Sequence, residues 1–466
     1  MTTPTDMKVA AIALNRFGLG VRSDEPLPAD PRRWLHEQFD HYLPLPPQWA
    51  GQPGSAALVA SYSDYQRELR QVDTAGELAL RQKLQKLSQE RYRSAVNARA
   101  VSALVTPAPF AERLVHFWAN HFAVSIDKAP LAVLAGAFEA EAIRPHVFGR
   151  FEDMLLAVEH HPAMLLYLDQ ARSIGPGSSI GQRAARANPQ RPRGLNENLA
   201  REVLELHTLG VRSGYGQDDV TELARALTGW SVGGLPFLPA TEQQGGFVFQ
   251  TALHEPGSRR VLGQRYEQPG EAQASAILHQ LAAAPATARH IAQKLARHFA
   301  GDVPPPALVS RLAETFLRSQ GDLPSVYRTL IDSPEVWDPP QSKFKTPWEW
   351  TLSALRGLGW QDLSGLRGQP LAPMLVQLGQ PAWRPGSPAG YDDFADSWAA
   401  PDSLMRRVEL AQRLAAQPGG IVDARVLAPQ LLPGGLSETT TSTIAGAESP
   451  ATALALLLAS PEFLRR

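Results

Sequence analysis

The sequence predicts a mainly α protein: a single large helical domain with long loops and one small β-hairpin. Three observations support this fold class. Strong helix formers (Ala, Leu, Arg, Glu and Gln) fill most of the long segments at helical periodicity. Only one stretch has the pattern of β-branched and aromatic residues that is typical of strands. The 40 prolines and 36 glycines indicate that the rest of the chain is rich in loops.

The helical pattern recurs along the whole chain, and its starts and stops are marked. Helices are expected around residues 65–104, 108–143, 151–170, 195–209, 217–229, 270–300, 305–333, 345–358, 402–416 and 450–465. The first segment is long, charged and poor in glycine and proline, which indicates one or two projecting helices. Pro107 and Pro109 mark the start of the second, because proline is favoured in the first turn of a helix. Gly210 marks the end of the fourth.

The hairpin is expected within residues 231–268, a stretch of loop and strand. Phe247-Val-Phe-Gln and Arg260-Val-Leu-Gly are the strands, joined by a turn through Glu255-Pro-Gly-Ser. A two-stranded hairpin is marginally stable alone, so it must pack on helices.

Long irregular tracts separate some of these elements. They are 170–194, 231–246, 362–401 and 417–448, so 362–448 is expected to be a loop-rich C-terminal region. Loops of more than about 15 residues in a compact domain are usually lids or binding loops, and we expect these to group over a cleft. Because no internal repeat or Pro/Ser-rich linker divides the chain, residues 1–466 are expected to form one domain.

Composition excludes several classes of function. The chain has no cysteine, which excludes disulfides, thiolate nucleophiles, iron–sulfur clusters and cysteine-based zinc sites. With 45 Lys+Arg against 46 Asp+Glu, the formal net charge is −1, so no electrostatic attraction to nucleic acid is expected. No apolar run approaches the 18 or so residues of a membrane span. Without a recognisable export signal we expect a cytoplasmic protein, or a periplasmic one if a leader has been removed.

One helix, in 194–210, has an unusual polar edge. At a rotation of about 100° per residue, its leucines and Val203 lie on one face, which is expected to pack on the core. Glu202 falls just outside this face. Asn198 and Glu205 follow within about the next 60° around the helix. Glu202 is therefore predicted to be at least partly buried. Two carboxylates in a low-dielectric setting raise the pKa of at least one, which is how a general acid is made at neutral pH. The alternative is a structural ion-pair network in which Arg201 or Arg225 neutralises both carboxylates.

The helix that follows carries Asp218 and Asp219 in its first turn, where the helix dipole favours negative charge. The simpler interpretation is a capped surface helix with an ion pair to Arg225. Thr228 and Trp230, at the end of this helix, can instead frame a pocket.

Histidines, arginines and loop tryptophans supply further candidates. Asn120 and His121 follow His116, but no metal-ligand spacing appears, so no metal and no cofactor are expected. A lone histidine beside tryptophan and phenylalanine is more often a hydrogen-bonded core residue. Trp383 and Trp398 lie in a Pro/Gly-rich loop, where they can stack on sugar rings or pin the loop to the core. Five arginines in 170–194 can clamp an anionic substrate or form a solvated basic loop: Arg172, Arg183, Arg186, Arg191 and Arg193.

The motifs resemble one family over nearly the whole chain. Asn196-Glu-Asn-x-Ala-Arg-Glu-x-x-Glu-Leu-His-Thr-Leu-Gly210 is followed by Gly214-Tyr-x-Gln-Asp-Asp-Val220 and Ala224-Arg-Ala-Leu-Thr-Gly-Trp230. Supporting stretches include Phe117-Trp-Ala-Asn-His-Phe122, Pro162-Ala-Met-Leu-x-Tyr-Leu-Asp169, His254-Glu-Pro-Gly257 and Pro388-Ala-Gly-Tyr391. Together they resemble the bacterial family catalogued as domain of unknown function eighteen hundred.

The resemblance implies a set of polar residues but no activity. The family pattern contains Asn120, His121, Asp169, Asn196, Glu197, Asn198, Arg201, Glu202, Glu205, Tyr215, Asp219, Arg225, Thr228 and Trp230. The family often has histidine where this chain has Ala119, so a metal site through that motif is less credible here. Family members often carry an export signal and are encoded beside a second uncharacterised family, catalogued as fifteen hundred and one, which implies a possible partner protein.

The leading functional hypothesis is a carboxylate-based hydrolase that acts on a saccharide or another polar polymer. Glu202 would be the acid and Glu205 or Asp219 the base or nucleophile. The expected substrate-binding residues are Asn120, His121, Asp169, Asn196, Glu197, Asn198, Arg201, Tyr215, Arg225, Trp230, Trp383 and Trp398. The alternatives are a non-catalytic binding or assembly partner of the companion envelope protein, and a metal-dependent enzyme.

Overall fold

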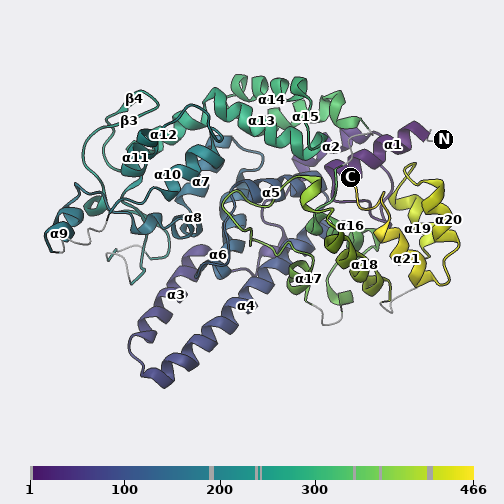
Figure 1. Cartoon of the computed structure of the whole chain (residues 1–466), viewed down its shortest axis with the longest axis horizontal. Helices are drawn as coiled ribbons and strands as arrows, with labels where there is room; N and C mark the ends of the chain where they lie inside the picture. The colour runs from purple at the N-terminus through teal and green to yellow at the C-terminus, as the bar shows by residue number, and fades with distance from the viewer. Residues whose placement is uncertain are drawn as a thin grey trace.

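The computed structural model describes residues 4–187, 194–236, 240–241, 244–338, 343–366, 370–416 and 423–466. Within these ranges α-helices dominate, and strands are confined to two small antiparallel pairs (Figure 1). The prediction of a mainly α fold is confirmed.

The first third of the chain builds one side of the molecule and its projecting arm. Its helices are α1 (Pro4–Ile12), α2 (Pro31–His41), α3 (Ser55–Leu69), α4 (Thr74–Val105), α5 (Pro109–His121), α6 (Leu131–Phe138), α7 (Phe151–His160) and α8 (Pro162–Tyr167). As predicted, a proline opens α5. The helix expected over 108–143 is two helices, α5 and α6, followed by a π-helical segment Glu139–Ile143.

The middle of the chain continues in helices but contains the strands. The helices are α9 (Ser179–Ala187), α10 (Asn198–Glu202), α11 (Gln217–Leu227), α12 (Glu271–Ala282), α13 (Pro285–Ala300), α14 (Pro306–Arg318), α15 (Leu323–Asp332) and α16 (Pro347–Gly357). The strands are β1 (Trp230–Val232), β2 (Phe247–Phe249), β3 (Arg259–Val261) and β4 (Gln264–Tyr266).

The last part of the chain has more helix than predicted. The tract 362–448, expected to be rich in loops, contains α17 (Leu371–Gln377), α18 (Pro401–Ala415), α19 (Ala424–Leu431) and α20 (Glu438–Ala445), and α21 (Pro450–Ala459) follows. Side-chain caps at Asp423 and Ser437 begin two of these short helices, and such helices are too short to show a clear hydrophobic period.

The predicted hairpin is wrong in its pairing. Residues 247–249 pair with β1, and β3 pairs with β4 through a two-residue turn at Leu262 and Gly263, which both have positive φ. Two positive φ values are typical of the tight turns that match the twist of paired strands. The segment expected to be the turn is a loop instead, because the Glu255 side chain accepts a hydrogen bond from the backbone of Gly177 (2.6 Å).

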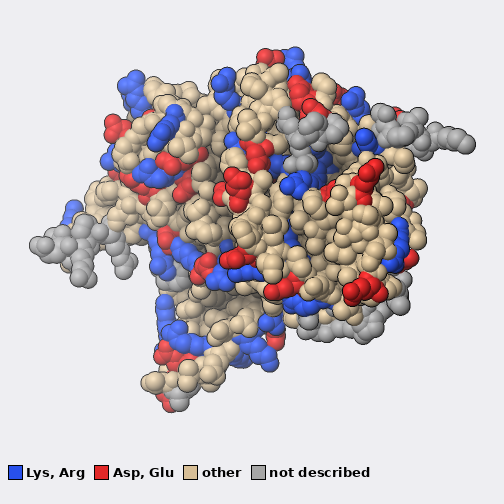
Figure 2. Space-filling model, turned by 45° about the vertical axis from the view of Figure 1, so that its right-hand side comes forward, with Lys and Arg blue, Asp and Glu red and all other residues tan. Residues whose placement is uncertain are grey.

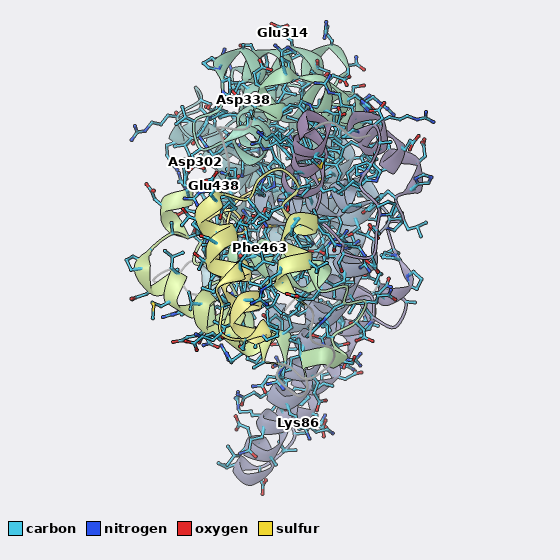
Figure 3. The ribbon with its side chains drawn as sticks, turned by 90° about the vertical axis from the view of Figure 1, so that its right-hand side faces the viewer. Lys86, Asp302, Glu314, Asp338, Glu438 and Phe463 are labelled. Carbon is cyan, nitrogen blue, oxygen red and sulfur yellow. The ribbon has the colours of Figure 1, made fainter. Side chains whose placement is uncertain are left out.

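An arm made of α3 and α4 projects from the body (Figure 1). Figure 3 shows Lys86 at the far end of this arm, away from the labelled residues of the body. The outer part of α4 is mostly exposed, whereas its last turns, including Val96, Ala100 and Ala103, are buried against the body. The range 65–104, over which projecting helices were predicted, covers the end of α3 and nearly all of α4.

Buried apolar residues form one cluster that runs from Ala13 to Leu464. Contacts between segments far apart in the sequence contribute to it: Phe17 stacks on Phe299 with ring centroids 5.4 Å apart, and Phe344 forms an isolated β-bridge with Arg465. That the chain forms one domain stays a prediction.

The surface carries mixed charge. Figure 2 shows lysine and arginine interspersed with aspartate and glutamate over the face that it draws, as the formal net charge of −1 leads one to expect. In the described part of the chain, no helix is both long and apolar enough to cross a membrane.

Candidate functional site

A cavity of about 470 Å³ lies where α5, α13, the start of α16 and the loop 380–394 meet. Its wall combines residues from six parts of the sequence, because Arg99 of α4 and the segment 206–211 also line it. Cationic and imidazole side chains make up much of it, together with aromatic rings; the polar and aromatic lining residues include Arg99, Arg113, His116, Phe117, Asn120, His121, His290, Lys294, Arg297, His298, Trp348, Glu349, Trp383, Tyr391, Asp393 and Phe394.

Helix α5 brings polar residues into the interior because nearly all of its residues are buried. Asn120, at its end, holds the loop that covers the cavity. Its amide donates to the carbonyl of Tyr391 (2.8 Å), and its carbonyl oxygen accepts from the Tyr391 backbone N–H (2.7 Å). Asn120 thus pairs with the loop as a backbone unit would, and its two polar atoms are used in positioning.

His121 and His290 present unprotonated nitrogens in this region. His121 Nε2 lies 3.2 Å from the carbonyl oxygen of His207, and His290 Nε2 lies 3.1 Å from that of Leu206. Because a carbonyl oxygen can only accept, each Nε2 carries the hydrogen and each Nδ1 keeps a lone pair. His121 is 1% exposed and its Nδ1 has no hydrogen-bond partner. The two ring centroids are 6.0 Å apart.

Both imidazoles are neutral at neutral pH. Burial, followed by the charge of Lys294, lowers the pKa of His121 well below its usual value and lowers that of His290 to about 4. A neutral imidazole whose Nδ1 is open to a ligand is a proton acceptor; because the Nδ1 of His121 is sealed from solvent, His290 is the potential base at the cavity.

Helix α13 presents a polar face to the cavity. His290, Lys294 and Arg297, at positions i, i+4 and i+7, fall on one side of a helix. Lys294 is half-buried, and no other described residue forms a hydrogen bond or ion pair with its ammonium group. Burial lowers its pKa to about 8, although Asp393 acts in the opposite direction. The Arg297 guanidinium lies over the ring of Phe394, 4.7 Å from its centroid.

The carboxylates of the cavity wall are held in ion pairs. Glu349 pairs with Arg113 and with Arg466 (3.0 Å), and Asp393 pairs with Lys343 (3.2 Å) and accepts a hydrogen bond from Nδ1 of the neutral His298 (3.1 Å). Burial opposes their ionisation, but these partners outweigh it and hold the pKa of both carboxyl groups well below the usual range. They therefore stay charged at neutral pH and do not donate protons.

The two predicted loop tryptophans have different positions. Trp383 lines the cavity, and its indole N–H donates to Glu139 (3.1 Å) while the guanidinium of Arg99 lies 5.2 Å from its ring centroid. Trp398 is behind the loop: its indole N–H donates to the carbonyl of Asp392 (2.9 Å), and its ring is 6.0 Å from Tyr391. Trp398 therefore supports the loop without reaching the cavity.

The three predicted catalytic carboxylates do not line the cavity. Glu202 is half-buried, as predicted, and burial raises its pKa. Glu205 lies 3.5 Å from Arg201. Asp219 accepts from the backbone N–H groups of Gly216 (2.8 Å) and Leu262 (2.7 Å), so it caps α11 and fixes the hairpin turn.

The helix type changes within the segment that carries the polar edge. The segment predicted as one α-helix over 195–209 is α10 followed by a π-helical segment, Val203–His207. The wider π turn alters the angle between residues on either side of Glu202. As a result, Leu206 is the residue of this segment that lines the cavity, one turn after Glu202.

Most of the other predicted binding residues take part in local contacts. Glu197 accepts from Gln217 and Thr221 (both 2.8 Å), and the side chain of Asn196 accepts from the backbone of Asn198 (2.8 Å). The remaining contacts are Asp169 with Lys128 (2.6 Å), Arg201 with Glu197 (3.5 Å) and Arg225 with Glu222.

Two aromatic residues of the predicted set and the arginine loop lie elsewhere. Tyr215 hydrogen-bonds to Glu205, and Trp230 is fully buried with its ring centroid 4.3 Å from that of His160. In the predicted anion clamp, Arg183 and Arg186 are exposed on α9, and Arg191 and Arg193 lie outside the described residues.

Sequence analysis identified Asn120, His121 and Trp383 but missed His290, Lys294 and Arg297. The missed signal is the polar row at i, i+4 and i+7 on a helix whose opposite face is apolar and buried. In the described ranges, no three His, Asp or Glu side chains converge in a way that could hold a metal ion.

Comparison with known proteins gives one match. A family model described as protein of unknown function matches residues 12–465, nearly the whole chain. No curated protein and no solved structure matches the sequence.

Proposed function

Because the chain belongs to the DUF1800 family, whose function is unknown, we propose its function from the cavity: it binds a small anionic organic molecule and acts on it by acid–base chemistry. The observation that carries this proposal is the meeting of an unpaired ammonium group, on Lys294, with the lone pair of His290 Nδ1 at one cavity.

The size and lining of the cavity support a small ligand. A volume of about 470 Å³ lies in the range that accommodates small molecules and cofactors. Trp348, Trp383 and Tyr391 supply aromatic surfaces, while Lys294 and Arg297 supply positive charge. An anion with a flat, partly apolar body matches both features.

An anionic ligand would also change the proton affinity of the two imidazoles. Opposite charge near a histidine favours its protonated form, so a bound anion would raise the pKa of His290 from about 4 toward neutrality. A histidine whose pKa lies near the working pH is an effective general acid or base. Binding is therefore expected to take up protons and to tighten as the pH falls from 8 to 6 or so.

Binding of defined anions tests the proposal. Benzoate, phenyl phosphate and glucuronate are compared with neutral benzamide and glucose by thermal shift and isothermal titration calorimetry. At least one anion should bind, and Lys294→Met should weaken it by about tenfold or more. Lys86→Met, at the end of the arm, is the matched control. Equal binding of anions and neutral compounds, or an unaffected Lys294→Met protein, would contradict the proposal.

One observation favours a second function, the acid–base hydrolysis of a saccharide by Glu202 and Glu205. Burial raises the pKa of Glu202, as a general acid requires, and the charge of Glu205 acts in the same direction. Glu202→Gln and Glu205→Gln proteins should then lose hydrolysis of any glycan that the wild-type protein cleaves. Wild-type activity in both variants would remove this assignment.

A further inference from the structure

We propose that Lys294 forms an imine with the carbonyl carbon of a small anionic aldehyde or ketone bound in the cavity. This inference rests on the proposed function, because the anion-binding cavity must first hold the carbonyl compound beside the amine.

The position of Lys294 distinguishes it from the other lysines. Lys128 and Lys343 are in ion pairs with aspartates (2.6 and 2.8 Å), and Lys345 is buried and donates to Ser353 (2.9 Å). Lys8, Lys83 and Lys86 are exposed on the surface. Lys294 lines the cavity. Its Nζ atom is not one of the polar side-chain atoms that are fully buried without a hydrogen-bond partner, so it is open to a ligand.

The surroundings of Lys294 also favour the reactive form of the amine. An imine forms from the neutral amine, and ordinary lysine is almost entirely protonated at pH 7. With its pKa lowered to about 8, about a tenth of Lys294 is neutral at pH 7. No ion-pair partner among the described residues has to be displaced before the nitrogen attacks.

His290 can supply the proton transfers that imine formation needs. The amine nitrogen attacks the carbonyl carbon, the C–O π pair moves to oxygen, and the oxygen takes up a proton, which gives a carbinolamine. Its hydroxyl leaves as water after a second protonation, while the nitrogen loses both of its protons, one at the carbinolamine stage and one as it forms the double bond to carbon. The sum is amine plus carbonyl giving imine plus water. His290 lies one helical turn before Lys294 and lines the same cavity, and its Nδ1, unlike that of His121, is not a sealed atom, so His290 can relay these protons.

Reductive trapping tests the imine directly. The full-length protein is incubated with 2-formylbenzoate, whose carboxylate and aldehyde are adjacent on the ring, and with sodium cyanoborohydride, and the alkylated lysines are identified by peptide mass spectrometry. Because the chain has only seven lysines, the rate at each one can be followed. Lys294 should be alkylated at least tenfold faster than Lys83 and Lys86, and excess benzoate should slow it. Neutral benzaldehyde should show no such preference.

Two variants separate charge from nucleophilicity. The Lys294→Met protein should lose both benzoate binding and reductive trapping. The Lys294→Arg protein keeps the positive charge, so it should bind benzoate but should not be trapped. Circular dichroism checks that both variants are folded. If benzoate binds through Lys294 but Lys294 is alkylated no faster than the surface lysines, the imine is wrong and the anion site stands. If no anion binds and Lys294 shows no preference, both proposals fall.

Discussion

Glu349 is the residue at which the cavity wall meets the core. It accepts hydrogen bonds from Arg113 and the backbone of Thr346, and Arg466 lies 3.0 Å away. All three side-chain partners in this cluster are buried: the exposed fractions of the Arg113, Arg466 and Glu349 side chains are 3%, 0% and 8%. Two cations thus depend on one carboxylate for their neutralisation.

Glu349→Gln should therefore be strongly destabilising. The substitution keeps the shape of the side chain but leaves two buried guanidinium groups without a counter-charge, which typically costs about 3–5 kcal/mol. The free energy of unfolding from denaturant titration measures this cost. Glu77→Gln removes the carboxylate of an exposed ion pair with Arg81 and should change stability by less than about 1 kcal/mol. A loss below 1 kcal/mol in Glu349→Gln would show that Arg113 and Arg466 do not depend on it.

At the same scale, Gly390 fixes how closely the cavity loop approaches α5. Its φ is +82°, and a Cβ there would lie 2.3 Å from the carbonyl oxygen of Asn120 and 2.8 Å from its side-chain oxygen. Glycine is required both for the backbone conformation and for the space.

A series of three alanine substitutions separates these two requirements. Gly386→Ala meets no atom within 4 Å and needs no positive φ, so stability should be unchanged. Gly379→Ala has open space but a φ of +87°, and should cost about 1–2 kcal/mol. Gly390→Ala adds the clash to the strain and should cost more than Gly379→Ala. Equal unfolding free energies for Gly379→Ala and Gly390→Ala would mean that the loop moves away from Asn120 without cost.

Among the elements, α4 is one helix with two environments. Its outer part is exposed on the arm, and its last turns are buried against the body. Because the stability of a helix comes mainly from tertiary packing, the two parts should open independently.

Hydrogen exchange along α4 measures this difference. Backbone amides around Lys83 and Lys86, both exposed, should exchange orders of magnitude faster than those around Ala100 and Ala103, both fully buried. The buried α16 is the internal reference for slow exchange. Uniformly slow exchange along α4 would show that the outer part of the arm is stabilised by a contact with another copy of the chain or with a partner.

The elements also show where sequence reasoning succeeds. The length and composition of 65–104 predicted the projecting helices, and Pro109 predicted the start of α5, because these signals are local. The π-helical segment Val203–His207 and the pairing of residues 247–249 with β1 were not predicted, since they depend on contacts between distant segments. Lys294 was missed for the same reason: only the folded chain brings α13 opposite α5 and the 380–394 loop.

For the whole molecule, buried neutral histidines make stability depend on pH. Burial lowers the pKa of His160, His290 and His298 to about 4, whereas in the unfolded chain it is about 6.5. The unfolded chain therefore binds more protons between these two values. The contribution of these histidines is fully present above about pH 6.5 and is lost as the pH falls to 4. Glu349 and Asp393, whose pKa is lowered, act in the same direction but below the usual carboxyl range.

The free energy of unfolding should accordingly fall steeply below pH 6.5. Each of the three histidines contributes about 1.4 kcal/mol per pH unit to the change in unfolding free energy. Between pH 6 and pH 5 the total slope is therefore expected to be about 4 kcal/mol per pH unit or more. Denaturant titrations at half-unit pH intervals measure this slope. His160→Phe keeps a ring between Trp230 and Phe247 and should lower the slope by about 1.4 kcal/mol per pH unit. His279→Gln, at a side chain that is 69% exposed, is the control. A flat profile down to pH 5 would mean that these histidines, including His290 of the cavity, are not buried in the neutral form, and the free Nδ1 base of His290 on which the proposed acid–base chemistry depends would be lost.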